Sequence, residues 1–217
     1  MAINDISLTA GMRNNLLALQ KTTQQLSQTQ DRLSSGKRVN SALDNPTNFF
    51  AAQSHLERAS DLNDRKDGMS EAVQTIKSAD NGIKAITALI QSAKGLASAA
   101  TSTSDTLSQL TYESQFLQIT SQITTLASDS GYRGTNLLTN STLAIEFSAK
   151  TGAASLSVAG FKADAVSLGV SSTANWTTVA NATQAMANMD NALTTLRAKS
   201  STLASNLSIV TARQDFT

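Results

Sequence analysis

The sequence predicts a mainly α-helical protein: an elongated rod of long coiled-coil-like helices, with a small β-hairpin between the third and fourth helices. Three observations lead to this prediction. Apolar residues recur every seven positions over long stretches, one proline occurs in 217 residues, and aromatic residues make up only 4%. Heptad spacing of this kind is typical of helices that pack along narrow aliphatic seams.

The first helix is predicted from about Asn4 to Leu33. Its apolar side chains form one narrow stripe on an otherwise polar helix. Four of them are spaced by seven, Met12, Leu19, Leu26 and Leu33, and Leu16 lies beside them. We expect the helix to end before Gly36, because glycine adopts the positive φ that terminates many helices. The polar segment 34–41 is then a loop.

The second helix is predicted to begin at Asn45-Pro46, an amide cap followed by a proline in the first turn, and to end near Ala100. Gly68, Gly82 and Gly95 leave a local break open, since glycine disfavours helix by ~1 kcal/mol relative to alanine. An unbroken helix would be roughly 80 Å long. A compact globule of 217 residues has a radius of gyration of roughly 17 Å, so the sequence predicts a rod.

The remaining elements follow from local signals. A turn at 101–104 should lead into a third helix that begins at Ser104-Asp105 and ends at Ser130-Gly131. Short apolar alternation at 143–147 and 155–158 predicts two or three strands. A fourth helix should begin near Asn175-Trp176, with Trp176 as its packing anchor, and continue almost to Thr217.

The heptad rows of the second, third and fourth helices define the predicted core of the rod. It comprises Leu62, Met69, Ile76, Ile83, Ile90, Phe116, Ile123, Met186, Leu193, Leu196 and Leu203.

Composition argues against nucleic-acid binding, thiol chemistry and zinc sites with two histidines. The net charge of +1 is unlike the basic excess of nucleic-acid binders. The chain has no cysteine and a single histidine, His55, so thiol chemistry and any zinc site with two histidines are excluded. We interpret His55 as a surface or seam-edge residue, and Asp61, Asp64 and Asp67 as a solvated helix face. We therefore predict no enzyme activity, no cofactor and no metal.

The sequence also lacks the usual signals for membrane targeting. No segment approaches the ~18 uninterrupted apolar residues of a membrane span, and residues 1–5 do not resemble a cleavable secretory signal. We expect no membrane insertion.

Three segments, in the same order along the chain, carry a family resemblance. Residues 33–44, Leu-Ser-Ser-Gly-Lys-Arg-Val-Asn-Ser-Ala-Leu-Asp, are similar to the signature that follows the first helix of bacterial flagellins. Residues 131–138 resemble the flagellin turn after the third helix, and residues 196–207 resemble the returning helix. The chain thus resembles a flagellin at both of the family's conserved ends.

The resemblance implies a structural subunit of the flagellar filament, located outside the cell and exported by the flagellar type III system. Its implied partners are other flagellin subunits, the export machinery, and the filament cap and junction proteins. It also implies a division of the chain: 1–44, inner-filament helix and linker; 45–138, outer rod; 139–174, reduced variable region; 175–217, returning helix.

Two departures from the family pattern qualify these expectations. Flagellins carry a further C-terminal helix, whereas this sequence stops at Thr217, so we expect a shortened chain. In flagellins recognised by the animal innate receptor, charged residues occupy the segment equivalent to 90–97. Here Ser92 and Gly95 stand in their place, which predicts weak recognition.

The sequence leaves two alternative functions open. A hook–filament junction protein shares the first signature, although its returning helix usually departs more. A coiled-coil signalling or adaptor protein would show paired methylation segments and a tight hairpin tip, neither of which is evident. A peptidase would need a His-Glu-x-x-His motif, which the sequence lacks.

The stripe on the first helix is the predicted subunit interface. Full burial of its five side chains would release about 7–15 kcal/mol, while ordering costs ~1–2 kcal/mol for each residue. We therefore expect residues 3–33 to be mobile in an isolated monomer and ordered between neighbouring subunits.

Overall fold

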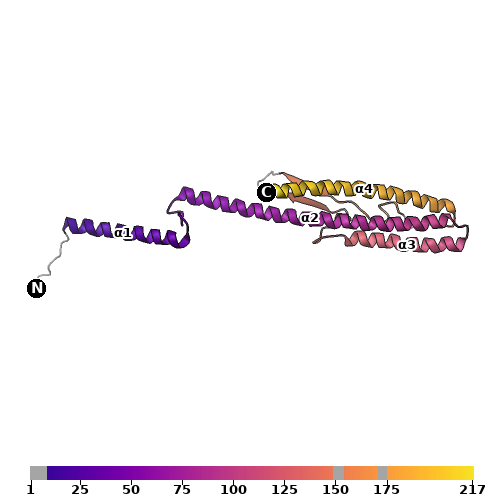
Figure 1. The fold of residues 1–217 in the computed structure, drawn as a ribbon, viewed down its shortest axis with the longest axis horizontal. Helices are drawn as coiled ribbons and strands as arrows, with labels where there is room; N and C mark the ends of the chain where they lie inside the picture. The colour runs from indigo at the N-terminus through magenta and orange to yellow at the C-terminus, as the bar shows by residue number, and fades with distance from the viewer. Residues whose placement is uncertain (1–8, 149–153, 171–174) are drawn as a thin grey trace. The chain divides into compact units, whose positions relative to one another are not determined.

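A computed structural model describes residues 9–148, 154–170 and 175–217 (Figure 1). These residues form four helices and one two-stranded antiparallel sheet, which lies between the third and fourth helices in sequence order. The predicted mainly α fold with a small β-hairpin is confirmed. Internal packing divides the chain into two units, Met1–Ser60 and Asp61–Thr217, and each unit is described by itself.

The first unit contains α1 (Ala10–Ser35) and the beginning of α2 (Pro46–Thr101). The hydroxyl of Thr9 caps α1 by accepting from the amide of Met12 at 3.4 Å, and Gly36 ends the helix at φ 66°. The side-chain oxygen of Asn45 accepts from the amide of Asn48 at 3.0 Å, as expected for the start of α2. The first residues of the predicted helix, 4–8, lie outside the described residues.

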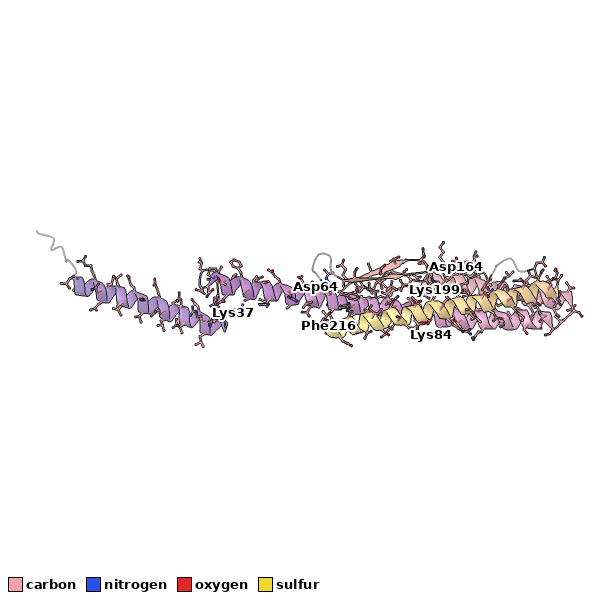
Figure 2. All side chains as sticks on the ribbon, turned by 90° about the horizontal axis from the view of Figure 1, so that it is seen from above. Lys37, Asp64, Lys84, Asp164, Lys199 and Phe216 are labelled. Carbon is pink, nitrogen blue, oxygen red and sulfur yellow. The ribbon has the colours of Figure 1, made fainter. Side chains whose placement is uncertain are left out.

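In the second unit, the long C-terminal part of α2, α3 (Thr106–Asp129) and α4 (Val179–Phe216) lie side by side (Figures 1 and 2). The side-chain contacts between α2 and α4 run in opposite orders along the two helices, so the helices are antiparallel. These contacts join Ser70 to Gln214, Asp80 to Ser200 and Lys94 to Asp190.

The α2 helix is continuous through its three glycines. At Gly82 a Cβ would lie 2.7 Å from the Cβ of Ser130 and 2.8 Å from Cδ1 of Leu138. The missing side chain therefore lets the turn after α3 approach the helix backbone, which explains a glycine at a buried helical position.

The core of the second unit combines large aliphatic side chains with alanines that allow the helices to approach closely. Nine of the eleven residues assigned to the core from heptad spacing are buried: Met69, Ile76, Ile83, Ile90, Phe116, Ile123, Leu193, Leu196 and Leu203. Leu62 and Met186 are half-buried, and Met186 packs against the cluster from its edge.

The hairpin consists of β1 (Thr142–Glu146) and β2 (Ser155–Ala159), with Leu143 opposite Val158 and Ile145 opposite Leu156. Ile145 and Val158 face the core, with 3% and 0% of their surfaces exposed. Contacts of charged side chains attach the hairpin and the residues after each strand to the helices: Arg65 pairs with Glu146 at 2.6 Å, Arg213 lies over Phe147, and Lys199 lies over Phe161.

The fourth helix begins at Val179 rather than near Asn175, so that start was wrong by about four residues. Trp176 is buried against Phe116, with ring centroids 4.7 Å apart, and its amide donates to a carboxylate oxygen of Glu113 at 3.0 Å. The hydroxyl of Thr178 accepts from the amide of Asn181 and caps the helix. Trp176 and Thr178 therefore lie before the first turn of α4, where Trp176 makes tertiary contacts and Thr178 caps the helix.

Candidate assembly surface

The apolar stripe on α1 is exposed within its own unit. Its side chains retain half or more of their surface: Met12 54%, Leu16 50%, Leu19 68%, Leu26 56% and Leu33 83%. No residue of α1 is buried. A helix with one apolar face and no covering partner has an unused packing surface.

Further apolar side chains of the first unit are exposed, and heptad reasoning missed them. They are Leu17, Leu43, Phe50 and Leu56, each more than 60% exposed. Leu17 lies off the stripe on α1, while Phe50 meets Phe49 edge to face at 5.6 Å between ring centroids. Two adjacent phenylalanines, in a chain with few aromatic residues, could have indicated an exposed apolar surface here.

The loop between α1 and α2 is organised by its own side chains. The Ser35 hydroxyl donates to Oδ1 of Asn40 at 2.6 Å, and the Lys37 amide donates to the Ser35 hydroxyl at 3.3 Å. The Asn40 amide donates to a carboxylate oxygen of Asp44 at 3.2 Å. Together with Gly36, which ends α1 at φ 66°, these hydrogen bonds give Ser35, Asn40 and Asp44 a structural role in the loop.

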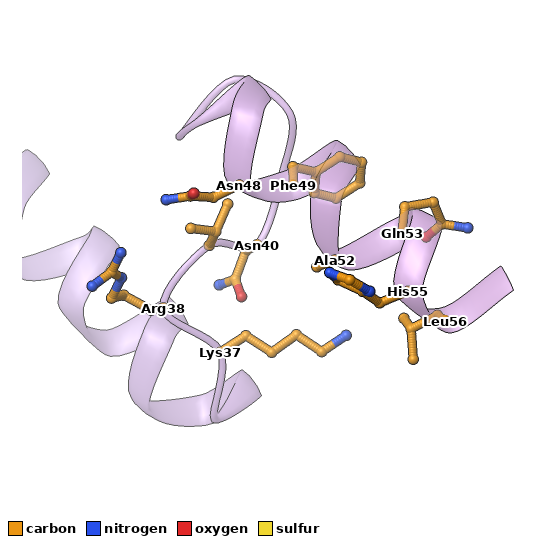
Figure 3. A pocket seen from close by; sticks show the side chains of 10 residues that line it. Lys37, Arg38, Asn40, Asn48, Phe49, Ala52, Gln53, His55 and Leu56 are labelled. Atoms are coloured by element: carbon orange, nitrogen blue, oxygen red, sulfur yellow. The ribbon is translucent and has the colours of Figure 1, made fainter. Parts of the chain in front are cut away.

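A hollow of about 610 Å³ lies between this loop and the first turns of α2 (Figure 3). Three basic side chains line it, Lys37, Arg38 and His55, together with the apolar side chains of Phe49 and Leu56. No acidic residue and no hydroxyl nucleophile is among its lining residues. The arrangement offers cationic and apolar contacts rather than a pair of groups for acid–base catalysis.

Charged groups in the second unit serve packing between elements. Burial raises the pKa of Asp80, but hydrogen bonds from Lys84 and Ser200 outweigh it and hold the pKa below its ordinary value. In the loop 160–170, the pKa of Asp164 is also lowered, because hydrogen bonds from the amide and hydroxyl of Ser167 outweigh the effect of burial. These carboxylates stabilise turns and helix contacts.

The described ranges 9–148, 154–170 and 175–217 contain no group of three or more histidine, aspartate or glutamate residues placed to hold a metal ion. Asp61, Asp64 and Asp67 are exposed. Within the same ranges, none of the helices combines the length and apolar character that crossing a bilayer requires.

The family of the chain follows from comparison with known proteins. The family described as the bacterial flagellin N-terminal helical region matches residues 3–142, which include α1, the organised loop, α2 and α3. The chain belongs to the bacterial flagellin family.

This flagellin is also similar to curated relatives over most of its length. Flagellin FljM of Caulobacter vibrioides is 30% identical over 204 residues, which cover 94% of this chain and 75% of the relative. Flagellin FljO of the same organism is 29% identical over the same shares of both chains.

A solved structure supports the fold. The crystal structure of Bacillus cereus flagellin matches this flagellin with a TM-score of 0.61 and 16% identity, covering 70% of this chain and 89% of that one. At this identity the likeness concerns the fold alone.

Proposed function

We propose that this flagellin is a structural subunit that polymerises into the bacterial flagellar filament and serves motility. Family membership supports the filament role. The observation that carries the assembly proposal is the five-residue stripe on α1, in a helix with no buried residue.

The proposed subunit interface consists of Met12, Leu16, Leu19, Leu26 and Leu33. Since these side chains already have about 20–50% of their surface covered, assembly would bury only the remainder. The gain is accordingly smaller than the ~7–15 kcal/mol of full burial. A filament needs a heterologous contact, in which one surface of a subunit meets a different surface of the next.

Each part of the chain has a proposed role in the filament. Residues 1–44 supply the inner-filament helix and linker, residues 45–138 and 175–217 supply the outer rod, and residues 139–174 form a reduced variable region. The buried heptad residues of the second unit are its proposed core, with half-buried Leu62 and Met186 at the edges.

Further roles rest on the family alone. The proposed location is the extracellular filament, reached through the flagellar type III exporter without a cleavable signal. The proposed partners are other flagellin subunits, the export machinery, and the cap and junction proteins. Weak recognition by the innate receptor is proposed because exposed Ser92 and Gly95 replace charged residues.

The subunit is proposed to be non-enzymatic, to need no cofactor and to bind neither nucleic acid nor membrane. No observation on the described ranges favours a hook–filament junction protein or a signalling adaptor.

The test is elongation of filament seeds by the variant Leu19→Ser/Leu26→Ser. We expect elongation to be lost, while the thermal unfolding of the second unit stays unchanged because neither residue belongs to it. The matched control is Gln24→Ser/Gln28→Ser, which changes the opposite face of the same helix and should preserve elongation. Long filaments from the double leucine variant, seen by electron microscopy, would contradict the interface.

A further inference from the structure

The methionines of this chain differ sharply in exposure. Met69 and Met189 are fully buried at 0%, and Met186 is half-buried. Met12 is 54% exposed in the first turn of α1, one turn before Leu16 in the stripe. Met1 lies outside the described residues. Among the described methionines, therefore, the most exposed residue lies on the proposed assembly surface.

We propose that Met12 is an oxidation site through which hydroperoxides control assembly. This inference rests on the proposed function, because the consequence of oxidation depends on the stripe being a subunit interface. Susceptibility to oxidation follows exposure, and the thioether of Met12 is open to a dissolved oxidant before assembly. Burial in the filament would then protect it.

The chemical step is a two-electron transfer of one oxygen atom. A lone pair of the Met12 sulfur attacks one oxygen of hydrogen peroxide, a sulfur–oxygen bond forms, and the oxygen–oxygen bond breaks. The proton on the transferred oxygen passes to the leaving hydroxide, which departs as water. The sulfur is oxidised to a sulfoxide and the peroxide is reduced.

Methionine sulfoxide at position 12 is unfavourable in a subunit interface that excludes water. A sulfoxide is a strong hydrogen-bond acceptor, and burying it without a donor costs free energy. The stripe members that follow Met12 along α1, Leu16 and Leu19, are aliphatic and offer the sulfoxide no hydrogen-bond donor. Oxidation therefore converts a contact that favours assembly into one that opposes it. Since sulfoxide formation is enzymatically reversible, the change would act as a switch.

The experiment treats the full chain with hydrogen peroxide, maps each methionine by mass spectrometry, and then measures elongation of filament seeds. We expect Met12 to oxidise at least about tenfold faster than Met69 and Met189, which react only through opened states. The concentration needed for elongation should rise by about tenfold or more. A methionine sulfoxide reductase should restore it.

The matched variant is Met12→Leu, which keeps the volume and apolar character of the side chain but removes the sulfur. It should elongate seeds equally well before and after peroxide treatment. Because Met12→Leu retains the other methionines, loss of its elongation after treatment would assign the effect elsewhere and overturn the proposal.

The remaining outcomes separate the two proposals. Normal elongation by wild-type chains carrying Met12 sulfoxide would overturn the switch and leave the proposed function intact. Equal oxidation rates for Met12 and Met69 would also overturn it. Failure of the untreated wild type to elongate seeds would count against the proposed function, and the switch would fall with it.

Discussion

Gly160 occupies a position where a side chain would collide with backbone atoms of the second unit. A Cβ there would lie 2.3 Å from the carbonyl oxygen of Ser141 and 2.6 Å from that of Leu137. Both oxygens are already engaged, since the Gly160 amide donates to Ser141 at 3.0 Å and the Phe161 amide donates to Leu137 at 2.8 Å. The variant Gly160→Ala therefore cannot be accommodated by rotating a side chain.

The size of the effect follows from these contacts. Overpacking costs about 1–3 kcal/mol, and weakening the two hydrogen bonds adds about 0.5–1.5 kcal/mol for each. The free energy of unfolding should fall by about 2–6 kcal/mol. For a unit of this size, each kcal/mol corresponds to roughly 2–4 °C in Tm, so the loss should be on the order of 10 °C.

Thermal unfolding followed by far-ultraviolet circular dichroism provides the assay. The matched control is Gly95→Ala, the same chemical change at an exposed helical position where a Cβ meets nothing within 4 Å. The control should raise the free energy of unfolding by about 0.5–1 kcal/mol. A Gly160→Ala variant that melts within about 1 °C of the wild type would show that the backbone around residue 160 tolerates a side chain.

Two further predictions concern the second unit. The lowered pKa of Asp80 means that this carboxylate stabilises the fold above its unfolded pKa, and that the stabilisation is lost as pH falls through the folded value. The stability difference between wild type and Asp80→Asn, measured by urea unfolding, should therefore shrink as pH falls below about 4; a difference that grows on acidification would contradict this. Trp176 is buried against Phe116, and its indole nitrogen has no hydrogen-bond partner among the residues that the structure describes. Trp176→Phe should accordingly cost less than about 1.5 kcal/mol, against about 3–5 kcal/mol for Trp176→Ala, and equal costs in urea unfolding would show that the ring is not packed as described.

Local signals were enough to predict most helix boundaries. Asn45-Pro46, Asp105 and Gly36 each mark a helix end through the chemistry of a few neighbouring residues, and the structure places the ends there. Alternating residues likewise predicted both strands. These features follow from local backbone preferences and do not depend on distant parts of the chain.

The sequence could not predict features that depend on contacts between distant residues. The helix α4 begins at Val179, later than predicted, because Trp176 packs against Phe116, which lies sixty positions earlier in the chain. Heptad spacing identifies a row on a helix but not how completely a partner covers it, so Leu62 and Met186 are only half-buried. The hollow beside His55 depends on the path of a loop, for which periodicity carries no information.

We propose that neighbouring subunits cover the stripe on α1, which the described residues leave exposed. The decisive measurement is hydrogen exchange of residues 12–33, compared between the isolated chain and assembled filaments. A polar helix without buried contacts is marginal alone, so these amides should exchange rapidly in the monomer and slowly in the filament. Protection in the monomer equal to that of residues 76–90 in α2 would contradict the claim.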